Sequence, residues 1–102
     1  MDKITILNYL KTVKSKYSDE GFIIKALFGS YSRDEATKDS DIDILVEAKP
    51  EFALKYGFKS ISRIKEIQDE LSTHFGLPVD LADITGMGKT GKKFIIDRAI
   101  YV

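Results

Sequence analysis

The feature that most constrains the fold of this chain is a pair of strand patterns separated by a polar stretch. Phe22–Phe28 is a nearly continuous apolar run, which is typical of a strand covered on both faces. Asp41–Val46 instead alternates, so that its apolar side chains fall on one face and its acidic side chains on the other. Strands of this kind are stable only in a sheet whose apolar face is covered by another layer.

Apolar residues at helical spacing precede these strands. Near the N-terminus they recur at steps of three or four, which predicts an amphipathic helix with one apolar face made of Ile4, Leu7, Leu10, Val13 and Tyr17. Asp2 is the expected N-cap of this helix, and the cluster at residues 18–21 ends it.

A longer helical pattern follows the second strand. It runs from about Phe52 to Phe75, is less regular between residues 52 and 60, and has Gly76 as its expected C-cap. Pro50 closes the strand before it. The apolar stripe of the predicted helix consists of Ile61, Ile64, Ile67, Leu71 and Phe75.

Shorter patterns complete the chain. Residues 78–84 form a third strand pattern, in which a proline is tolerated only at the first position. We expect a short helix at residues 33–36, a flexible connection at Gly86–Gly91, and a short helix at residues 94–102 that ends in extended chain. The prediction is one α+β domain over residues 1–102, with a small mixed β-sheet and helices packed on it.

Composition excludes several classes of protein. The 16 basic residues balance the 16 acidic ones, whereas a dedicated nucleic-acid binder usually has a basic excess, so nucleic acid is not the expected partner. The absence of cysteine excludes disulfides, zinc–thiolate sites and thiol nucleophiles. The N-terminus lacks the apolar run of a signal peptide, and no stretch approaches the roughly 20 apolar residues of a membrane span. We expect a cytoplasmic protein without membrane contact.

Two acids on the second strand are the strongest chemical signal. Asp41 and Asp43 point the same way, roughly 6–7 Å apart along the strand. That spacing lets both reach a pair of cations held about 3.5–4 Å apart, as in two-metal phosphoryl and nucleotidyl transfer. Carboxylate oxygens suit magnesium, and converging carboxylates without a cation repel each other.

Gly29 and Ser30 lie where the first strand ends. A glycine lets the backbone approach a phosphate closely, and free N–H groups beside the Ser30 hydroxyl form an anion site. Arg33 either adds a charged contact to the phosphates or anchors the loop. We therefore predict nucleotide binding at Gly29, Ser30 and Arg33.

A third carboxylate is expected on a neighbouring strand. Asp80 has the opposite phase to Val79 and Leu81, and it would face the same surface as the first two acids if the third strand lies beside the second. Its expected roles are metal ligand and acceptor of the attacking hydroxyl's proton. Asp83 has the other phase and is not favoured.

The motif Gly29-Ser30, ten residues, Asp41-x-Asp43, with Asp80 later, resembles the signature of the DNA polymerase β-type nucleotidyltransferase superfamily. It is most similar to the minimal nucleotidyltransferases of HEPN–MNT toxin–antitoxin pairs. The resemblance implies a polymerase β palm-like fold in which Asp41 and Asp43 bind two Mg²⁺ ions, Asp80 completes the catalytic one, and Ser30 holds the triphosphate.

The same resemblance implies a function. The chain would be an antitoxin that transfers AMP from ATP to a tyrosine of a cognate HEPN-domain ribonuclease and thereby silences it. Two alternatives stay open: a catalytically degenerate antitoxin that acts by binding alone, and a nucleotidyltransferase subunit with a small-molecule or nucleic-acid acceptor.

Weaker signals need a separate interpretation. Gly86–Gly91 has the spacing of a phosphate-binding loop, but Lys93 stands where a Walker loop needs Ser or Thr, so a hinge is favoured. The segment 47–59 is long for a tight strand–helix connection and is a candidate contact to the acceptor. Other residues with an open role are a basic cluster, the single histidine and an aromatic residue in the loop: Lys89, Lys92, Lys93, Arg98, His74 and Tyr31.

Overall fold

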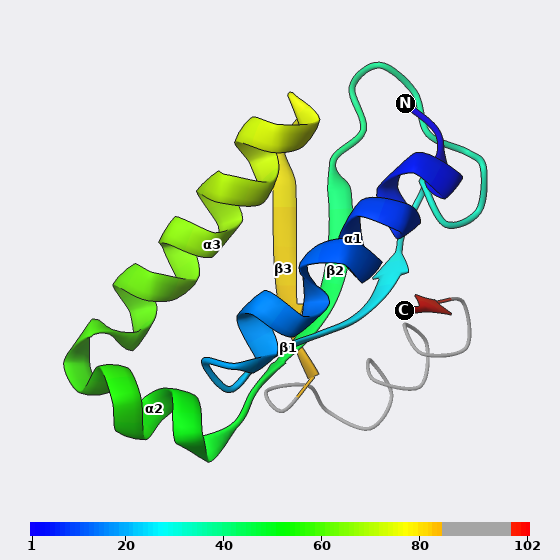
Figure 1. The fold of residues 1–102 in the computed structure, drawn as a ribbon. Coiled ribbons are helices and arrows are strands. Elements are labelled where there is room, and N and C mark those ends of the chain that lie inside the picture. The colour runs from blue at the N-terminus through cyan, green and yellow to red at the C-terminus, as the bar shows by residue number, and fades with distance from the viewer. Residues whose placement is uncertain (85–98) are drawn as a thin grey trace.

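The computed structural model describes residues 1–84 and 99–102. Its elements, in chain order, are α1 (Lys3–Ser18), β1 (Phe22–Phe28), β2 (Ile42–Ala48), α2 (Pro50–Tyr56), the 3₁₀ turn η1 (Gly57–Lys59), α3 (Ser60–Phe75), β3 (Val79–Asp83) and β4 (Ile100–Tyr101) (Figure 1). No helix among these residues is long and apolar enough to span a bilayer.

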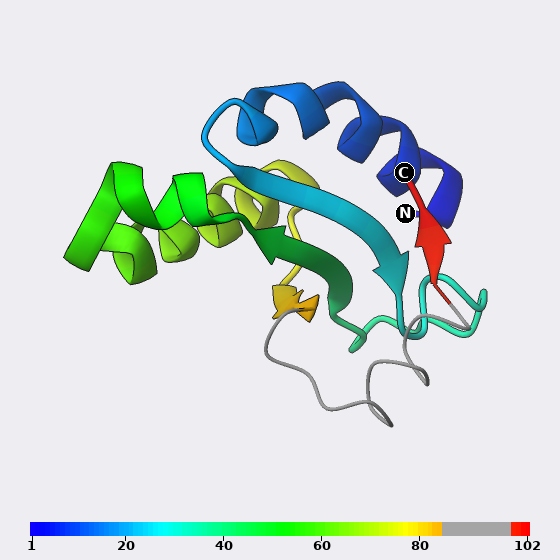
Figure 2. The ribbon, with the colours of Figure 1, turned by 90° about the horizontal axis from the view of Figure 1, so that it is seen from below.

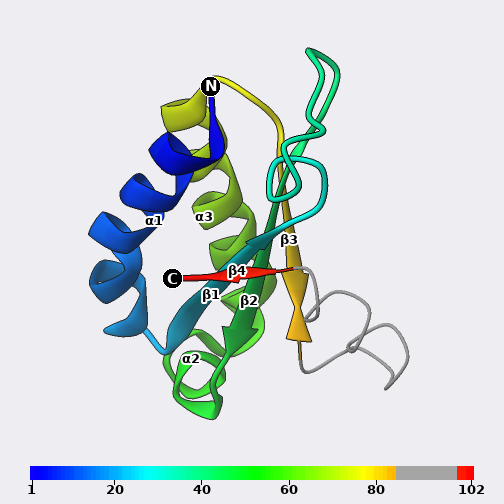
Figure 3. The same ribbon diagram turned by 90° about the vertical axis from the view of Figure 1, so that its right-hand side faces the viewer.

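The described strands form one mixed sheet in the order β3-β2-β1-β4. β1 pairs antiparallel with β2 and with β4, whereas β2 and β3 run parallel. The helices α1 and α3 lie on the same side of this sheet, as Figures 2 and 3 show. The predicted α+β architecture is therefore confirmed.

The core lies between the helices and the sheet. The side chains that fill it come from α1, the strands and α3, and the most deeply buried of them include Ile6, Leu10, Ile24, Ile42, Ile44, Ile67 and Leu71. Because one sheet face is committed to this core, the functional groups of the strands must lie on the other face or at the strand ends.

The predicted helices are present, with corrections to their apolar faces. Asp2 caps α1 by accepting a hydrogen bond from the Thr5 N–H at 2.9 Å, as expected. Ile4, however, is 57% exposed, and Ile6 is buried in its place. On a helix of about 3.6 residues per turn, Ile4 lies about a third of a turn away from Leu10, whereas Ile6 lies nearly above it.

The second helical pattern is divided. Pro50 opens α2 at its first turn, where a missing N–H is harmless, and η1 separates α2 from α3. Gly76 caps α3 in the left-handed conformation, as predicted. Ile61 was expected in the buried stripe but is 81% exposed, because the first turn of α3 extends beyond the sheet (Figure 1).

Three smaller expectations need correction or limits. β1 was expected to be covered on both faces. In the described part of the chain one face is buried, whereas Ile23 and Lys25 on the other face are half-buried. The short helix predicted at residues 33–36 is wrong: a single turn forms earlier, at residues 29–34, and ends at Asp34 with a φ of 58°. The end of the chain pairs as β4, whereas Gly86–Gly91 and residues 94–98 lie outside the described residues.

Candidate functional site

The parallel pairing of β2 and β3 brings two of the predicted acids together. In the register of these strands, Asp43 lies directly opposite Asp80, while Ile42 faces Val79. Ile42 and Val79 are buried beneath the helices, so the two acids face the opposite side of the sheet. Asp83 pairs with Val46 near the other end of these strands, and its Oδ2 accepts a hydrogen bond from the Ala48 N–H at 3.4 Å.

Asp41 joins this pair at the beginning of β2. It is exposed and lies immediately before the strand, two residues from Asp43. Partial burial raises the pKa of Asp43 above its usual range, the nearby charges of Asp80 and Asp41 raise it further, and the charge of Arg33 opposes them. Asp80 and Asp41 thus lie close enough to Asp43 for their negative charges to act on it, and a bound cation would relieve this repulsion.

Gly29 makes contact with the acidic group from the side of β1. Its φ is 76°, a conformation that residues with a Cβ rarely adopt, and an added Cβ would overlap Oδ2 of Asp43. The pairing of Phe28, at the end of β1, with Asp43, at the start of β2, creates this contact. Glycine is therefore required here for both conformation and space.

The turn after Gly29 is organised by its own backbone. The N–H groups of Ser32 and Arg33 donate to the carbonyls of Gly29 and Ser30 at 3.2 Å, and the Glu35 N–H donates to the same Ser30 carbonyl at 2.9 Å. The Ser32 hydroxyl also donates to the Gly29 carbonyl at 2.7 Å. This turn does not use the N–H groups that precede Ser32, so they remain suited to an anion.

Arg33 has a partner inside the loop. Its Nε donates to Oε2 of Glu35 at 3.1 Å, and its side chain is partly exposed. Of the two roles considered for Arg33, this contact favours the anchoring of the loop, although its charge also acts on Asp43. Tyr31 packs in the core and is only 7% exposed, so its ring is part of the fold and is not free to stack on a base.

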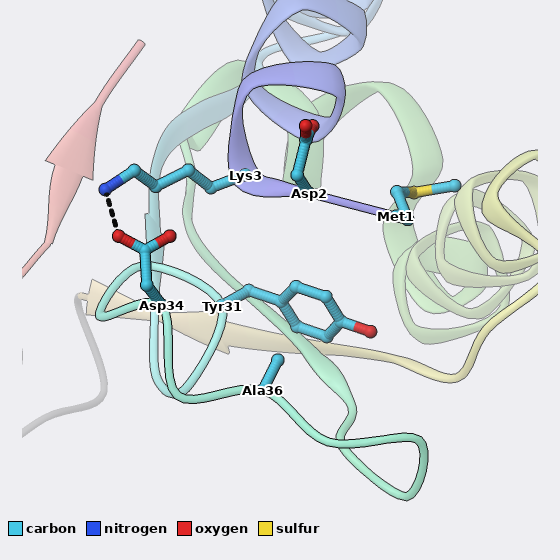
Figure 4. Close-up of a pocket in the computed structure, with 6 residues that line it drawn as sticks. All are labelled: Met1, Asp2, Lys3, Tyr31, Asp34 and Ala36. Carbon is cyan, nitrogen blue, oxygen red and sulfur yellow. Dashed lines mark hydrogen bonds and ion pairs between the residues drawn. The ribbon is translucent and has the colours of Figure 1, made fainter.

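A small hollow lies between this loop and the start of α1. It is lined by Met1, Asp2, Lys3, Tyr31, Asp34 and Ala36 (Figure 4). Across it, Nζ of Lys3 contacts Oδ2 of Asp34 at 2.8 Å. The sequence patterns did not indicate this ion pair, because its members are far apart in the chain and neither belongs to a motif.

The carboxylates suit magnesium by their chemistry. Mg²⁺ typically takes one or two carboxylates and completes its shell with water and substrate phosphates, which fits Asp43 and Asp80 on adjacent strands beside a phosphate-type turn. Within residues 1–84 and 99–102, no three acidic or histidine side chains are already arranged to hold one ion. The number of ions therefore stays a prediction.

The other residues singled out in the sequence do not join this group. The imidazole of His74 stacks on the ring of Tyr9, with centroids 3.5 Å apart, on the helical layer. His74 belongs to the last turn of α3 and is exposed, which is typical of a surface residue. Lys89, Lys92, Lys93 and Arg98 lie outside the described residues.

Comparison with known proteins adds independent information. A family model described as a nucleotidyltransferase domain matches residues 6–102. A candidate protein adenylyltransferase of Methanocaldococcus jannaschii is 38% identical over 102 residues, covering 98% of this chain and 93% of that protein. The protein adenylyltransferase MntA of Thermococcus cleftensis is 31% identical over 93 residues, covering 89% of this chain and 87% of MntA.

Two solved structures are similar in fold. A candidate minimal nucleotidyltransferase superimposes with a TM-score of 0.76 at 26% identity, covering 100% of this chain and 97% of that one. A toxin–antitoxin structure with AMP-PNP has a TM-score of 0.63 at 22% identity, covering 99% of this chain and 72% of that one. The second likeness concerns the fold alone.

Proposed function

We propose, from the premise that this chain belongs to the family of nucleotidyltransferase domains, that it is a metal-dependent enzyme that transfers AMP from ATP to a hydroxyl group of a partner protein. The names of its relatives support the protein acceptor, since both a Methanocaldococcus jannaschii relative and MntA of Thermococcus cleftensis are described as protein adenylyltransferases. The acceptor that we infer is a tyrosine of a HEPN-domain ribonuclease toxin, in line with the toxin–antitoxin structure of similar fold.

Each residue of the site has a role in this reaction. Asp41 and Asp43 would hold the magnesium ions, and Asp80 would complete the shell of the catalytic one. The turn that begins at Gly29 and Ser30 would hold the β- and γ-phosphates through backbone N–H groups and the serine hydroxyl. When bound, the ions supply charge stabilisation for the phosphates and orient the attacking and leaving oxygens.

The chemistry is a single displacement. The acceptor oxygen forms a bond to the α-phosphorus of ATP while the bond from that phosphorus to its bridging oxygen breaks, and pyrophosphate leaves. Asp80 accepts the hydroxyl proton directly or through one water molecule, since it faces the open side of the sheet. The products are adenylylated protein, pyrophosphate and one proton.

The observation that carries this proposal is the position of Asp43. It lies opposite Asp80 in the register of β2 and β3, next to Asp41, and against the α-carbon of Gly29. The charges of Asp41 and Asp80 both act on Asp43, which also lies against Gly29, and this arrangement of groups from separate parts of the chain has no use in the core. A structural role alone would not require converging like charges.

The direct test is transfer of label. The chain is incubated with α-labelled ATP, Mg²⁺ and the purified product of the adjacent reading frame. We expect label on a tyrosine of that product and a loss of at least about a hundredfold in rate for Asp41→Asn and Asp80→Asn. The matched control is Asp39→Asn, an exposed acid of the loop before β2. Full activity of Asp80→Asn would refute the assigned role.

One observation favours the rival in which the chain silences its partner by binding alone: among the described residues the acids are not already arranged around an ion. A survival assay distinguishes silencing by AMP transfer from silencing by binding alone. Cells that express the toxin should be protected by the wild-type chain and by Asp39→Asn, but not by the Asp41→Asn/Asp43→Asn double variant. Full protection by the double variant would favour binding without catalysis.

A further inference from the structure

The corner where α2 turns into α3 exposes three large apolar side chains. Leu54 is 85% exposed, Phe58 107% and Ile61 81%. They belong to α2, η1 and the first turn of α3, within eight successive residues, and we call this surface the α2–α3 corner. Figure 1 places it at the far end of the helical layer from the N-terminus. Single exposed apolar residues are ordinary, but a local group of three is a feature of interaction surfaces.

The fold does not need these side chains. The inward contacts of the same segment are made by Phe52, which is 1% exposed and packs against Phe22 with ring centroids 5.4 Å apart, and by Tyr56, 5.0 Å from Phe52. Leu54 and Phe58 point away from that packing, as their exposure shows. Their apolar side chains therefore reduce solubility and add no packing to the core.

The same segment has a local positive charge in a chain with no net charge. Residues 52–65 contain four basic side chains and no acidic one. Arg63 and Lys65 are neutralised by ion pairs with Glu20 and Asp69 at 2.7 and 3.0 Å. Lys55 and Lys59 have no carboxylate partner within the part of the chain that the structure describes. The corner thus combines exposed apolar groups with two lysines, of which Lys55 also places its Nζ 5.6 Å from the centroid of the Tyr56 ring.

We propose that the α2–α3 corner is the docking surface for the protein acceptor of the adenylyl group, and that this acceptor presents an apolar patch bordered by carboxylates. This inference rests on the proposed function for the identity of the partner. Charge complementarity with Lys55 and Lys59 sets the acidic border, and burial of Leu54, Phe58 and Ile61 supplies the affinity.

The chemistry of the corner favours a protein over a nucleic acid or a membrane. Proteins that bind single strands combine several stacking rings with a basic groove, whereas this corner has one exposed ring, Phe58, between two aliphatic side chains. A membrane-binding helix presents a continuous apolar face, whereas these three side chains are divided among α2, η1 and α3. An apolar protein surface matches all three side chains.

The position of the corner also says what kind of acceptor can use it. The candidate active site lies at the start of β2, whereas the corner follows its end, and the 7 residues of β2 span about 20 Å. An acceptor peptide of three or four residues, at about 3.3 Å per residue, is too short to occupy both places. A partner that uses both places extends over at least about 20 Å, so its recognition is separated from the chemistry.

The test compares a folded acceptor with a peptide. The variant Leu54→Ser/Phe58→Ser/Ile61→Ser is titrated with the purified product of the adjacent reading frame, and transfer is measured to that protein and to a synthetic peptide containing its acceptor tyrosine. We expect Kd and KM for the folded protein to rise at least about tenfold, because burial of one large apolar side chain is worth about that factor. The turnover at saturation and the KM for the peptide should stay unchanged.

Two further variants serve as a control and as a separate test of the charges. Ile4→Ser removes an exposed apolar residue from α1 and should leave all constants unchanged. Lys55→Glu/Lys59→Glu keeps the apolar groups and should slow association, and added salt should then speed association, whereas it slows association of the wild type. If the triple variant loses helical circular dichroism or has a lower Tm than the wild type, the Kd of the charge variant alone tests the docking surface.

The outcomes separate this inference from the proposed function. Unchanged Kd in the triple and charge variants overturns the docking surface even when AMP transfer is observed. Corner-dependent binding without AMP transfer supports the surface and refutes the transferase activity. Self-association of the isolated chain through Phe58, or Phe58-dependent binding to vesicles containing phosphatidylserine, replaces the protein acceptor and overturns the proposal.

Discussion

At the scale of single residues, the contact between Gly29 and Asp43 joins the phosphate turn to the acidic group. The carboxylate of Asp43 occupies the space that a Cβ on Gly29 would fill. A displacement of Gly29 would therefore also move Asp43, and the geometry of the candidate site depends on the absence of a Cβ at position 29. The carboxylate of Asp43 is thus positioned by backbone packing as well as by its strand.

We expect Gly29→Ala to reduce AMP transfer at least about a hundredfold, because the new Cβ displaces Asp43 and misplacement of reacting groups by about 1 Å is costly. It should also destabilise the fold, since the left-handed conformation costs about 1–2 kcal/mol for a residue with a Cβ. Urea unfolding and the label-transfer assay measure the two effects.

Gly76→Ala is the matched control for this variant. Gly76 has a similar φ of 69°, but an added Cβ there would meet nothing within 4 Å. It should lose a similar part of the stability and keep its activity. Equal activity of the two alanine variants would show that the contact with Asp43 is not needed for transfer.

At the scale of elements, a charged network ties the three helices together. Nη2 of Arg63 in α3 donates to Oε2 of Glu20, in the turn after α1, at 2.7 Å, and the Tyr56 hydroxyl of α2 donates to the same carboxylate. Tyr17 of α1 donates to Glu70 of α3 at 2.6 Å. The side chains of Arg63 and Glu20 are only 14% and 13% exposed, so solvent screens them little.

This network predicts a loss of stability in acid. Hydrogen bonds from Arg63 and Tyr56 lower the pKa of Glu20 from 4.5 to about 2. The ionised carboxylate therefore stabilises the fold fully above about pH 4.5, and this contribution disappears as the pH falls toward 2. Between pH 7 and pH 3 the wild type should lose on the order of 2 kcal/mol more unfolding free energy than Glu20→Gln does.

Urea titrations at several pH values test this expectation. The appropriate control is Glu66→Gln, because Glu66 also pairs with Arg63, at 3.6 Å, but is 65% exposed. Its pH profile should follow that of the wild type. Parallel profiles for the wild type and Glu20→Gln would instead indicate that the network contributes no pH-dependent stability.

At the scale of the whole molecule, the sheet has the core on one face and the candidate site on the other. One face and the helices form the core, while the other face has Asp43 and Asp80 near the starts of β2 and β3, with Asp41 just before β2. The acids raise the pKa of Asp43 when no cation is bound, so they destabilise the empty protein at neutral pH. The packing of the rest of the fold must therefore offset this loss of unfolding free energy.

Asp43→Asn should therefore raise the Tm of the protein in EDTA while it abolishes AMP transfer. In the wild type, Mg²⁺ and ATP at about 100 times their Kd should add about 2.7 kcal/mol of stability through linkage, and EDTA should remove this gain. Asp43→Asn should not respond to the ligands. Thermal melts with and without Mg²⁺, with Asp39→Asn alongside, provide the measurement. A variant less stable than the wild type in EDTA would contradict the repulsion.

Much of this molecule could be predicted from local patterns. The spacing of apolar residues located α1, α3 and three strands, and the caps Asp2 and Gly76 were correct, because caps and periodicity act within one or two turns. The two errors have different causes, because Ile4 lies on a different face of α1 from Leu10, whereas Ile61 lies in the first turn of α3, which extends beyond the sheet. The pairing of β4 could not be predicted, since a strand of 2 residues has no period.

The sequence by itself determined the type of each main element and the residues of the motif from Gly29 to Asp43, because periodicity and spacing are local properties of the chain. Only the tertiary structure decided that β3 lies parallel beside β2 with Asp80 opposite Asp43, and that Lys3 meets Asp34. Strand order, register and contacts between distant residues depend on how the apolar faces are buried together, and that is a property of the whole fold.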